Sequence, residues 1–525
     1  MRNTVRRMAS MILATSLVGF NAAPVFAQHH SDAAAGYRTA TPIKHVVVIF
    51  QENVSFDHYF ATYPHATNPE GESQFHAKEG TPSVNGLPNT LRNQNPNGSP
   101  TPFRLDPSQN YTCDMNHDYT PEQQAFDSGL MDKFPEFTGT ACTSIANLAS
   151  FGPGIVMGYY DGNTVTGMWN LAQYFSLNDN SFGTTFGPST PGAVNLVSGM
   201  TGNADLKHSI DDSGGDLEAD VVNAAIIGDP DPFYDDCGSP DQTSLKGLNI
   251  GDLLNAKGIS WGWFQGGFKP SAPASAGAPA QCNTATNRID GTPETAYSAH
   301  HNPFMYYAST ANPHHLPPAS VWEVGHSGQA NHQYDISEFW KAAEAGNLPA
   351  VSFLKAPRAN DGHPSNSSPL DEQLFVLETI DALELLPEWN DTAVIIAWDD
   401  SDGWYDHVIG PIVNQSASTA DALTGSGACG TGANALAGLQ SRCGYGPRLP
   451  LLAVSPYARE NFVDNTLTDQ SSILRFIEDN WGTGRIGVGS YDQIAGPVTH
   501  MFDFSHRRFE RVFFNPHTGE VIGRD

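Results

Sequence analysis

The sequence predicts an α/β protein with a mostly parallel central sheet flanked by helices. Three observations support this fold class: short apolar runs, helical patterns between them, and 525 residues without an internal repeat. Continuous apolar runs are typical of strands covered on both faces, and helical connections between such strands make the pairing parallel. We expect buried strands at residues 45–50, 259–264, 350–354, 393–398 and 451–454.

Apolar residues at helical spacing predict two of the flanking helices. The first covers residues 371–386, and the second covers residues 469–480, with Thr468 as its expected cap. Both lie between or after predicted strands, as crossover helices of a parallel sheet should. The apolar face of the first helix is formed by Leu370, Leu374, Leu377 and Ile380.

The rest of the chain is irregular, with 50 glycines and 37 prolines in all. The longest such stretches are residues 63–110, 266–295 and 410–446. We expect them to be ordered loops that wall a pocket above the sheet. Because no linker or charge block divides the sequence, one catalytic domain over residues 28–525 is predicted.

The first 27 residues have the pattern of a secretory signal peptide. Three arginines precede the apolar residues 8–20, and Val25-Phe26-Ala27 provides the exit. We expect residues 1–27 to be removed and the mature protein to be secreted or periplasmic. No later segment is long and apolar enough to cross a bilayer, so no stable membrane insertion is expected.

The charge of the chain limits its partners. The formal net charge is −30, and loss of the three N-terminal arginines would take it to −33. Such a field repels nucleic acid and anionic membrane surfaces, so no nucleic-acid partner is expected. A phosphate-ester substrate must therefore meet a local positive centre. The composition predicts no particular oligomeric state.

The six cysteines predict disulfide bonds, because the expected compartment permits oxidation. Six cysteines allow 15 connectivities, and we favour sequential pairing because each pair then closes one polar insertion. None has the C-x-x-C spacing of a zinc or redox motif. The expected pairs are Cys113 with Cys142, Cys237 with Cys282, and Cys429 with Cys443.

Polar residues follow two of the predicted strands directly. Glu52 and Asn53 come after the first strand, and Asp399 and Asp400 come after the strand at 393–398. Strand ends are where parallel sheets hold ligands, and carboxylate and amide oxygens suit a divalent cation. These four residues are the predicted metal ligands. The alternative is that Glu52 caps the next helix and that the Asp399 cluster is a solvated turn.

A hydroxyl pair, Ser189-Thr190, lies between Gly187-Pro188 and Pro191-Gly192. The prolines fix the backbone, and the following residues look helical, so Ser189 is expected near a helix N-terminus, where backbone N–H groups favour an anion. This is a suitable position for a nucleophile that attacks phosphate, once a base or a metal activates it. The alternative is a capping Ser-Thr pair without a catalytic role.

Four histidines could surround a phosphoryl group. Imidazolium donors stabilise the charge that develops on phosphate oxygens and can protonate a leaving group, and they favour mildly acidic pH. Any one of them alone could be structural, and two adjacent histidines in a strand would point to opposite faces. The candidates are His117, His300, His301 and His363.

Several ordered segments together resemble the bacterial phosphoesterase family of AcpA-type acid phosphatases and non-specific phospholipases C. The resemblance implies an alkaline-phosphatase-like fold with a divalent metal ion at the strand ends. It also implies the roles suggested above for the acidic residues, Ser189 and the four histidines. The segments are residues 43–60 (IKHVVVIFQENVSFDHYF), 300–304 (HHNPF), 398–407 (WDDSDGWYDH) and 446–459 (GPRLPLLAVSPYAR).

Two departures from the family pattern affect the site. Gly192-Ala193 stands where the family often has Asn-Arg, which leaves Thr190 as an alternative nucleophile. The run 400–403 (DSDG) stands where the family often has Glu-His-Gly-Gly, which makes the fourth ligand less certain. Oxygen ligands fit calcium, magnesium, manganese or iron, so the metal is not identified.

The expected function is a secreted, metal-dependent acid phosphatase that hydrolyses phosphate monoesters through a phosphoserine at Ser189. Monoesters are favoured because the sequence stops at Asp525, whereas larger lipases of the family often carry C-terminal β-modules. The first alternative is a phospholipase C that cleaves phospholipid phosphodiesters with the same residues. The second is an inactive secreted binding protein.

Overall fold

The computed structural model describes residues 34–208, 217–430, 436 and 439–525. The predicted signal peptide at residues 1–27 lies outside the described residues, so its cleavage and the export of the chain stay predictions. Within the described ranges, no helix has the length and apolar character that a membrane span needs.

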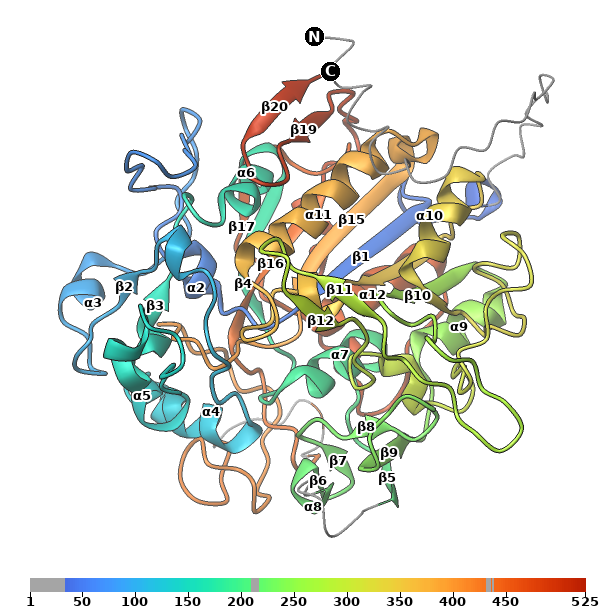
Figure 1. The fold of residues 1–525 in the computed structure, drawn as a ribbon, viewed down its shortest axis with the longest axis horizontal. Helices are drawn as coiled ribbons and strands as arrows, with labels where there is room; N and C mark the ends of the chain where they lie inside the picture. The colour runs from blue at the N-terminus through green and yellow to red at the C-terminus, as the bar shows by residue number, and fades with distance from the viewer. Residues whose placement is uncertain (1–33, 209–216, 431–435, 437–438) are drawn as a thin grey trace.

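A nine-stranded sheet forms the centre of the described structure (Figure 1). Its order is β13-β10-β14-β1-β15-β16-β4-β17, with β18 beside β4. All neighbours pair in parallel except β16, which is antiparallel to both β15 and β4. The strands are β1 (His45–Gln51), β4 (Ser176–Phe182), β10 (Trp261–Gln265), β13 (Gln333–Asp335), β14 (Val351–Lys355), β15 (Thr392–Trp398), β16 (Arg448–Val454), β17 (Phe462–Asp464) and β18 (Thr468–Asp469).

The predicted α/β class with a mostly parallel sheet is confirmed, and each of the five predicted strands is present. Side chains of β1 alternate between two cores: Val47 and Ile49 pack on one face, and Val46, Val48 and Phe50 pack on the other. Helices cover both faces (Figure 1). One face carries α6 (Thr166–Tyr174), α10 (Ile336–Glu344) and α11 (Pro369–Glu384), and the other carries α7 (Ser189–Ser198), α9 (Ile250–Lys257) and α12 (Gln470–Trp481).

The two predicted helices are α11 and α12, and one expected cap is wrong. α11 begins at Pro369 and is capped by Ser368, and its residues Leu377 and Ile380 are buried as predicted. α12 is capped by Asp469 rather than by Thr468, because the Asp469 carboxylate accepts the backbone N–H of Ser471. Thr468 instead pairs with β4 in β18.

The remaining elements are short and lie on the long connections (Figure 1). All six cysteines pair as predicted: Cys113 with Cys142, Cys237 with Cys282, and Cys429 with Cys443. That the chain folds as one catalytic domain stays a prediction. The short elements are α2 (Phe56–Phe60), α3 (Asn89–Asn93), α4 (Tyr119–Phe126), α5 (Phe134–Phe137), α8 (Leu217–Asp220), β2 (Phe103–Arg104), β3 (Gly158–Tyr159), β5 (Ala204–His208), β6 (Val221–Val222), β7 (Ala225–Ile226), β8 (Asp231–Pro232), β9 (Gln242–Leu245), β11 (Ala285–Asn287), β12 (Pro293–Thr295), β19 (Val512–Phe514) and β20 (Val521–Arg524).

Candidate active site

The predicted acidic residues meet at one edge of the sheet. β1 and β15 are neighbouring parallel strands with Gln51 opposite Trp398, so the residues that follow each strand lie side by side. Glu52, Asp399 and Asp400 are each at most 2% exposed, which rules out a solvated turn. Glu52 also caps no helix, because the N-cap of α2 is Ser55.

Ser189 begins α7 and lies on these carboxylates. Its Oγ is 3.0 Å from Glu52 Oε2 and 3.2 Å from Asp400 Oδ2. The N-cap position belongs to Pro188, so Ser189 is the first residue of the helix rather than its cap. The Thr190 hydroxyl faces elsewhere, 3.4 Å from the Tyr306 hydroxyl. Of the two hydroxyls, only that of Ser189 contacts the acidic residues.

Gly192 brings α7 against the end of β15. A Cβ atom at this position would lie 2.1 Å from the carbonyl oxygen of Asp399, closer than two non-bonded atoms can approach. Any larger residue would therefore push the first turn of α7 away from the strand. The departure from the family pattern at Gly192 thus coincides with the close packing that places Ser189 next to Asp400.

The adjacent histidines His300 and His301 have different partners. His301 Nδ1 lies 3.1 Å from Glu52 Oε1, inside the acidic cluster. His300 Nδ1 lies 3.4 Å from Asp231 Oδ1, and the two imidazole rings are nearly perpendicular at 85°. Both rings therefore border the cluster, but only His301 contacts a predicted ligand.

The other two histidines form a pair next to Asn53. His117 Nε2 is 3.5 Å from Asn53 Nδ2, and His117 Nδ1 is 3.4 Å from Asp402 Oδ1. The ring of His363 packs edge-on against His117, with 6.2 Å between the centroids. The structure thus gathers all four predicted histidines around the acidic residues.

The electrostatics divide these histidines into two kinds. Burial opposes protonation of His117 and His300, but the neighbouring carboxylates outweigh it and raise the pKa of both groups, in His117 well above the usual value. Burial dominates at His301 and His363 and lowers the pKa of both. The four expected imidazolium donors are therefore not equivalent, because the surroundings favour protonation of His117 and His300 and oppose protonation of His301 and His363.

The carboxylates also differ from one another. Burial raises the pKa of Asp400 to about 7 and that of Asp399 well above its usual value. Burial acts in the same direction on Glu52, but the facing His301 ring and above all the Lys355 ammonium hold its pKa well below the usual value. Glu52 is thus the carboxylate of the cluster whose surroundings most favour the ionised form.

Asn53 tests whether a cation fits these residues. Its backbone has a φ of 55°, in the left-handed region that residues other than glycine rarely adopt. Its backbone N–H donates to Asp399 Oδ1 at 3.2 Å, and its Nδ2 donates to Asp402 Oδ1 at 3.4 Å. Its buried Oδ1 has no hydrogen-bond partner in the described part of the chain. An orphaned amide oxygen beside three carboxylates fits a divalent cation.

Sequence reasoning missed several charged residues of the site. Lys355 ends β14 and follows the predicted strand at 350–354 directly, so the rule that identified Glu52 would also have identified this lysine. Asp402 lies in the same acidic run as Asp399. Asp229 accepts the backbone N–H of Thr190 at 2.8 Å, and Asp231 begins the short strand β8. Neither lies in a segment that carries a sequence signal.

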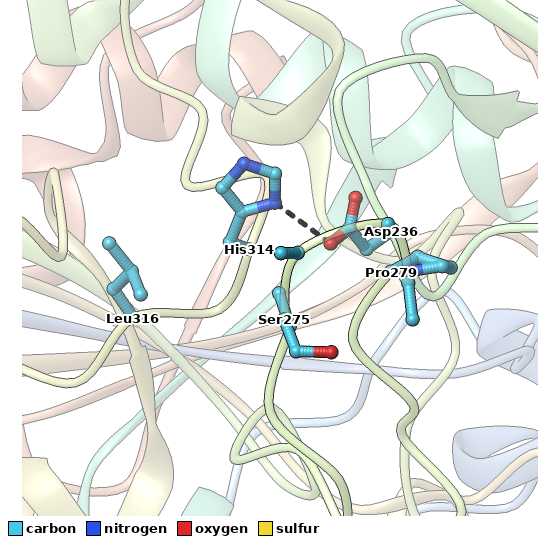
Figure 2. A pocket seen from close by; sticks show the side chains of 9 residues that line it. Asp236, Ser275, Pro279, His314 and Leu316 are labelled. Atoms are coloured by element: carbon cyan, nitrogen blue, oxygen red, sulfur yellow. Dashed lines mark hydrogen bonds and ion pairs between the residues drawn. The ribbon is translucent and has the colours of Figure 1, made fainter.

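A separate hollow lies on the surface (Figure 2). It has a volume of about 570 Å³ and is lined by residues 274–279 together with Asp236, His314 and Leu316. His314 Nδ1 lies 2.8 Å from Asp236 Oδ2, as Figure 2 shows. None of the described residues that line this hollow is a predicted site residue, so the candidate active site is the acidic edge of the sheet.

Comparison with known proteins identifies relatives over most of the chain. The model of the Phosphoesterase family matches residues 43–484. Non-hemolytic phospholipase C of Pseudomonas aeruginosa is 23% identical over 493 residues, which cover 91% of this chain and 60% of that protein. Non-hemolytic phospholipase C of Burkholderia pseudomallei is 25% identical over 506 residues, with 90% and 61% covered. The chain thus spans about 60% of the length of these two relatives.

Two further comparisons differ in weight. Phospholipase C A of Mycobacterium tuberculosis is 24% identical over 489 residues, which cover 89% of this chain and 78% of that protein. A solved structure of a protein in the alkaline phosphatase superfamily from Vibrio parahaemolyticus aligns over 69% of each chain, at 11% identity. Its TM-score of 0.30 is too low to support an argument about the fold.

Proposed function

Because the chain belongs to the Phosphoesterase family, we propose that it hydrolyses phosphate esters with Ser189 as its nucleophile. One observation carries the proposal: Ser189 Oγ lies 3.0 Å from Glu52 Oε2 and 3.2 Å from Asp400 Oδ2, at the first turn of α7. A hydroxyl held on carboxylates can give up its proton, and N–H groups at a helix start attract an anionic phosphoryl group.

In the proposed reaction the Ser189 oxygen attacks phosphorus in line with the leaving alcohol. The bond from phosphorus to the alcohol oxygen breaks, a phosphoserine forms, and the departing alkoxide takes a proton from His117, against which the His363 ring packs. His300 and His301 hold the phosphoryl oxygens. Water then attacks the phosphoserine in the reverse geometry and gives one proton back to the histidine. Ser189 takes back the proton that it gave to the neighbouring carboxylates, and the phosphate product leaves.

The proposed reaction includes a divalent cation held by Glu52, Asn53, Asp399 and Asp400. When bound there, such an ion supplies positive charge that lowers the pKa of a nearby hydroxyl and neutralises phosphate oxygens. The orphaned Oδ1 of Asn53 supports this ligand set. The donor atoms are all oxygens, so calcium, magnesium, manganese and iron are each compatible with them.

The substrate we propose is a phospholipid phosphodiester. Three relatives that cover about nine-tenths of this chain are named phospholipases C, and this supports the alternative reading of the sequence over monoester hydrolysis. The leaving alcohol is then a diglyceride, and the final product is the phosphorylated head-group alcohol. The acid phosphatase expected from the sequence stays a prediction, because no comparison reported above names that activity.

The experiment compares two substrates with the wild-type protein and Ser189→Ala. Diglyceride release from phosphatidylcholine vesicles would support the phospholipase C, and faster phosphate release from an aryl monoester would favour the acid phosphatase instead. The serine variant serves as the blank for both assays. The inactive binding protein would be supported if neither substrate were turned over at any pH or with any added divalent metal, while the protein still bound the substrates.

A further inference from the structure

A buried lysine lies inside the proposed cation site. Lys355 ends β14, the strand next to β1, and is 1% exposed. Its Nζ contacts Glu52 Oε1 directly and lies 3.4 Å from Asp399 Oδ2. The lysine therefore contacts two of the proposed metal ligands. Nothing in the proposed reaction uses its ammonium group.

The contacts of Glu52 separate its two carboxylate oxygens. Oε1 faces the basic side, where the Lys355 ammonium and the His301 ring at 3.1 Å approach it. Oε2 faces Ser189, at 3.0 Å from Oγ. A carboxylate held by a buried ammonium on one oxygen cannot rotate freely, so Lys355 fixes which oxygen of Glu52 faces the nucleophile.

The charges of the cluster give the lysine a second effect. Glu52, Asp399 and Asp400 carry three negative charges when ionised, and Lys355 offsets one of them. Buried carboxylates without a counter-charge are strongly unfavourable, so this ammonium stabilises the metal-free protein. It also repels an arriving cation, because both compete for the same oxygens.

We propose that Lys355 is a positioning residue that orients Glu52 and Asp399 and limits the affinity of the site for its divalent cation. This inference rests on the proposed function, because it takes Glu52 and Asp399 as cation ligands. The inference goes beyond the proposed function because it assigns a fixed positive charge to the site. Removal of the charge should therefore have opposite effects, with a less stable metal-free protein and tighter cation binding.

A purely structural lysine would behave differently. If Lys355 only holds the two carboxylates in place, its replacement should loosen the ligands and weaken cation binding together with stability. If it instead contacts the substrate phosphate, its replacement should raise KM and leave the cation affinity unchanged. The direction of the change in cation affinity therefore distinguishes the three roles, whatever happens to turnover.

The experiment uses Lys355→Met, which keeps the length of the side chain and removes its charge. The full-length protein is freed of metal with a chelator, and Mn²⁺ binding is measured by titration calorimetry. We expect a Kd at least tenfold lower than in the wild type and a lower Tm without metal. Lys44→Met is the matched control. Lys44 lies just before β1, at the end of that strand away from Glu52, and its ammonium donates to Thr39 Oγ1 at 3.1 Å.

A double variant covers the case in which Lys355→Met does not fold without metal. Glu52→Gln with Lys355→Met removes one negative and one positive charge, so its metal-free Tm should exceed that of Lys355→Met alone. An equal or lower Tm, or an unchanged or higher Kd for Mn²⁺ in Lys355→Met, would overturn the inference. If the wild type itself binds no Mn²⁺, Mg²⁺, Ca²⁺ or Fe²⁺, the cation site of the proposed function fails and the inference fails with it.

Discussion

Ser189 Oγ lies 3.0 Å from Glu52 Oε2, although 137 positions separate the two residues in the chain. The contact joins the start of α7 to the end of β1, two elements that neither follow one another in sequence nor pair in the sheet. It depends on the sheet order, which sets β1 beside β15, and on the packing of α7 against the end of β15. The predictions below test the parts of this arrangement separately.

Ser189→Ala should lower kcat by about 10³-fold or more, because it removes the attacking oxygen. The fold should persist, since the lost hydroxyl only faces carboxylates that the remaining groups still hold. Circular dichroism and the Tm check the fold, and hydrolysis of the preferred ester checks kcat. Thr190→Ala is the control, and it should retain at least about a tenth of the wild-type rate. The reverse pattern would identify Thr190 as the nucleophile.

Gly192→Ala should disrupt the site by displacing α7. The added Cβ would lie 2.1 Å from the Asp399 carbonyl oxygen, and such overpacking costs about 1–3 kcal/mol. We expect a lower Tm together with loss of turnover, because Ser189 moves with the first turn of the helix. Gly251→Ala on α9 is the comparison: its Cβ would lie 2.3 Å from the Trp261 ring, so it should lower the Tm but leave cation affinity unchanged.

Chelation of divalent metal should abolish turnover, and addition of the correct ion should restore it. Asp400→Asn removes a charged ligand and should weaken the binding of that ion by about 100-fold or more, as measured by calorimetry. Glu122→Gln is the matched control, because Glu122 is buried nearby and accepts Ser401 Oγ and the Gly187 N–H at 2.7 and 3.0 Å. Unchanged cation affinity in Asp400→Asn would remove Asp400 from the ligand set.

The fold could be predicted from the sequence wherever burial leaves an apolar run. β1, β14 and β15 are such strands, and the polar residues that follow β1 and β15 identified the acidic edge of the sheet. β4 was missed because it reads Ser-Leu-Asn-Asp-Asn-Ser-Phe, yet most of it is buried. Its polar side chains form hydrogen bonds with the chain between β17 and β18. Asn178 Nδ2, for example, donates to the Thr466 carbonyl at 3.0 Å. A strand that is buried with polar partners of this kind shows no hydrophobic pattern in its sequence.

The site was predictable to a similar extent. The proposed ligands and Ser189 lie at element ends, where sequence position carries information about function. Asp229 and Asp231 reach the site only because the start of β8 lies against the first turn of α7, as the contact from the Thr190 N–H to Asp229 at 2.8 Å shows. That contact depends on tertiary packing, so neither residue could be assigned from its local sequence.

Stability should fall as the pH rises from about 5 to 9, because several buried carboxyl groups keep their protons in the folded protein. Glu384 ends α11, and burial raises its pKa from 4.5 to about 8. Between these values the folded state binds more protons than the unfolded state, so unfolding becomes easier as the pH rises. The stabilisation is complete below the unfolded pKa and is lost as the pH passes 8.

Glu384→Gln isolates this contribution, because glutamine resembles the protonated acid at every pH. Glu384 Oε2 accepts the Val512 N–H at 2.9 Å, and an amide oxygen can do the same. We expect the variant to lie within about 1 kcal/mol of the wild type near pH 5 and to exceed its unfolding free energy by about 5 kcal/mol near pH 9. Glu344→Gln, at the exposed end of α10, is the control and should leave the unfolding free energy unchanged at both pH values. Parallel pH curves for wild type and Glu384→Gln would show that Glu384 is ionised in the folded protein throughout this range.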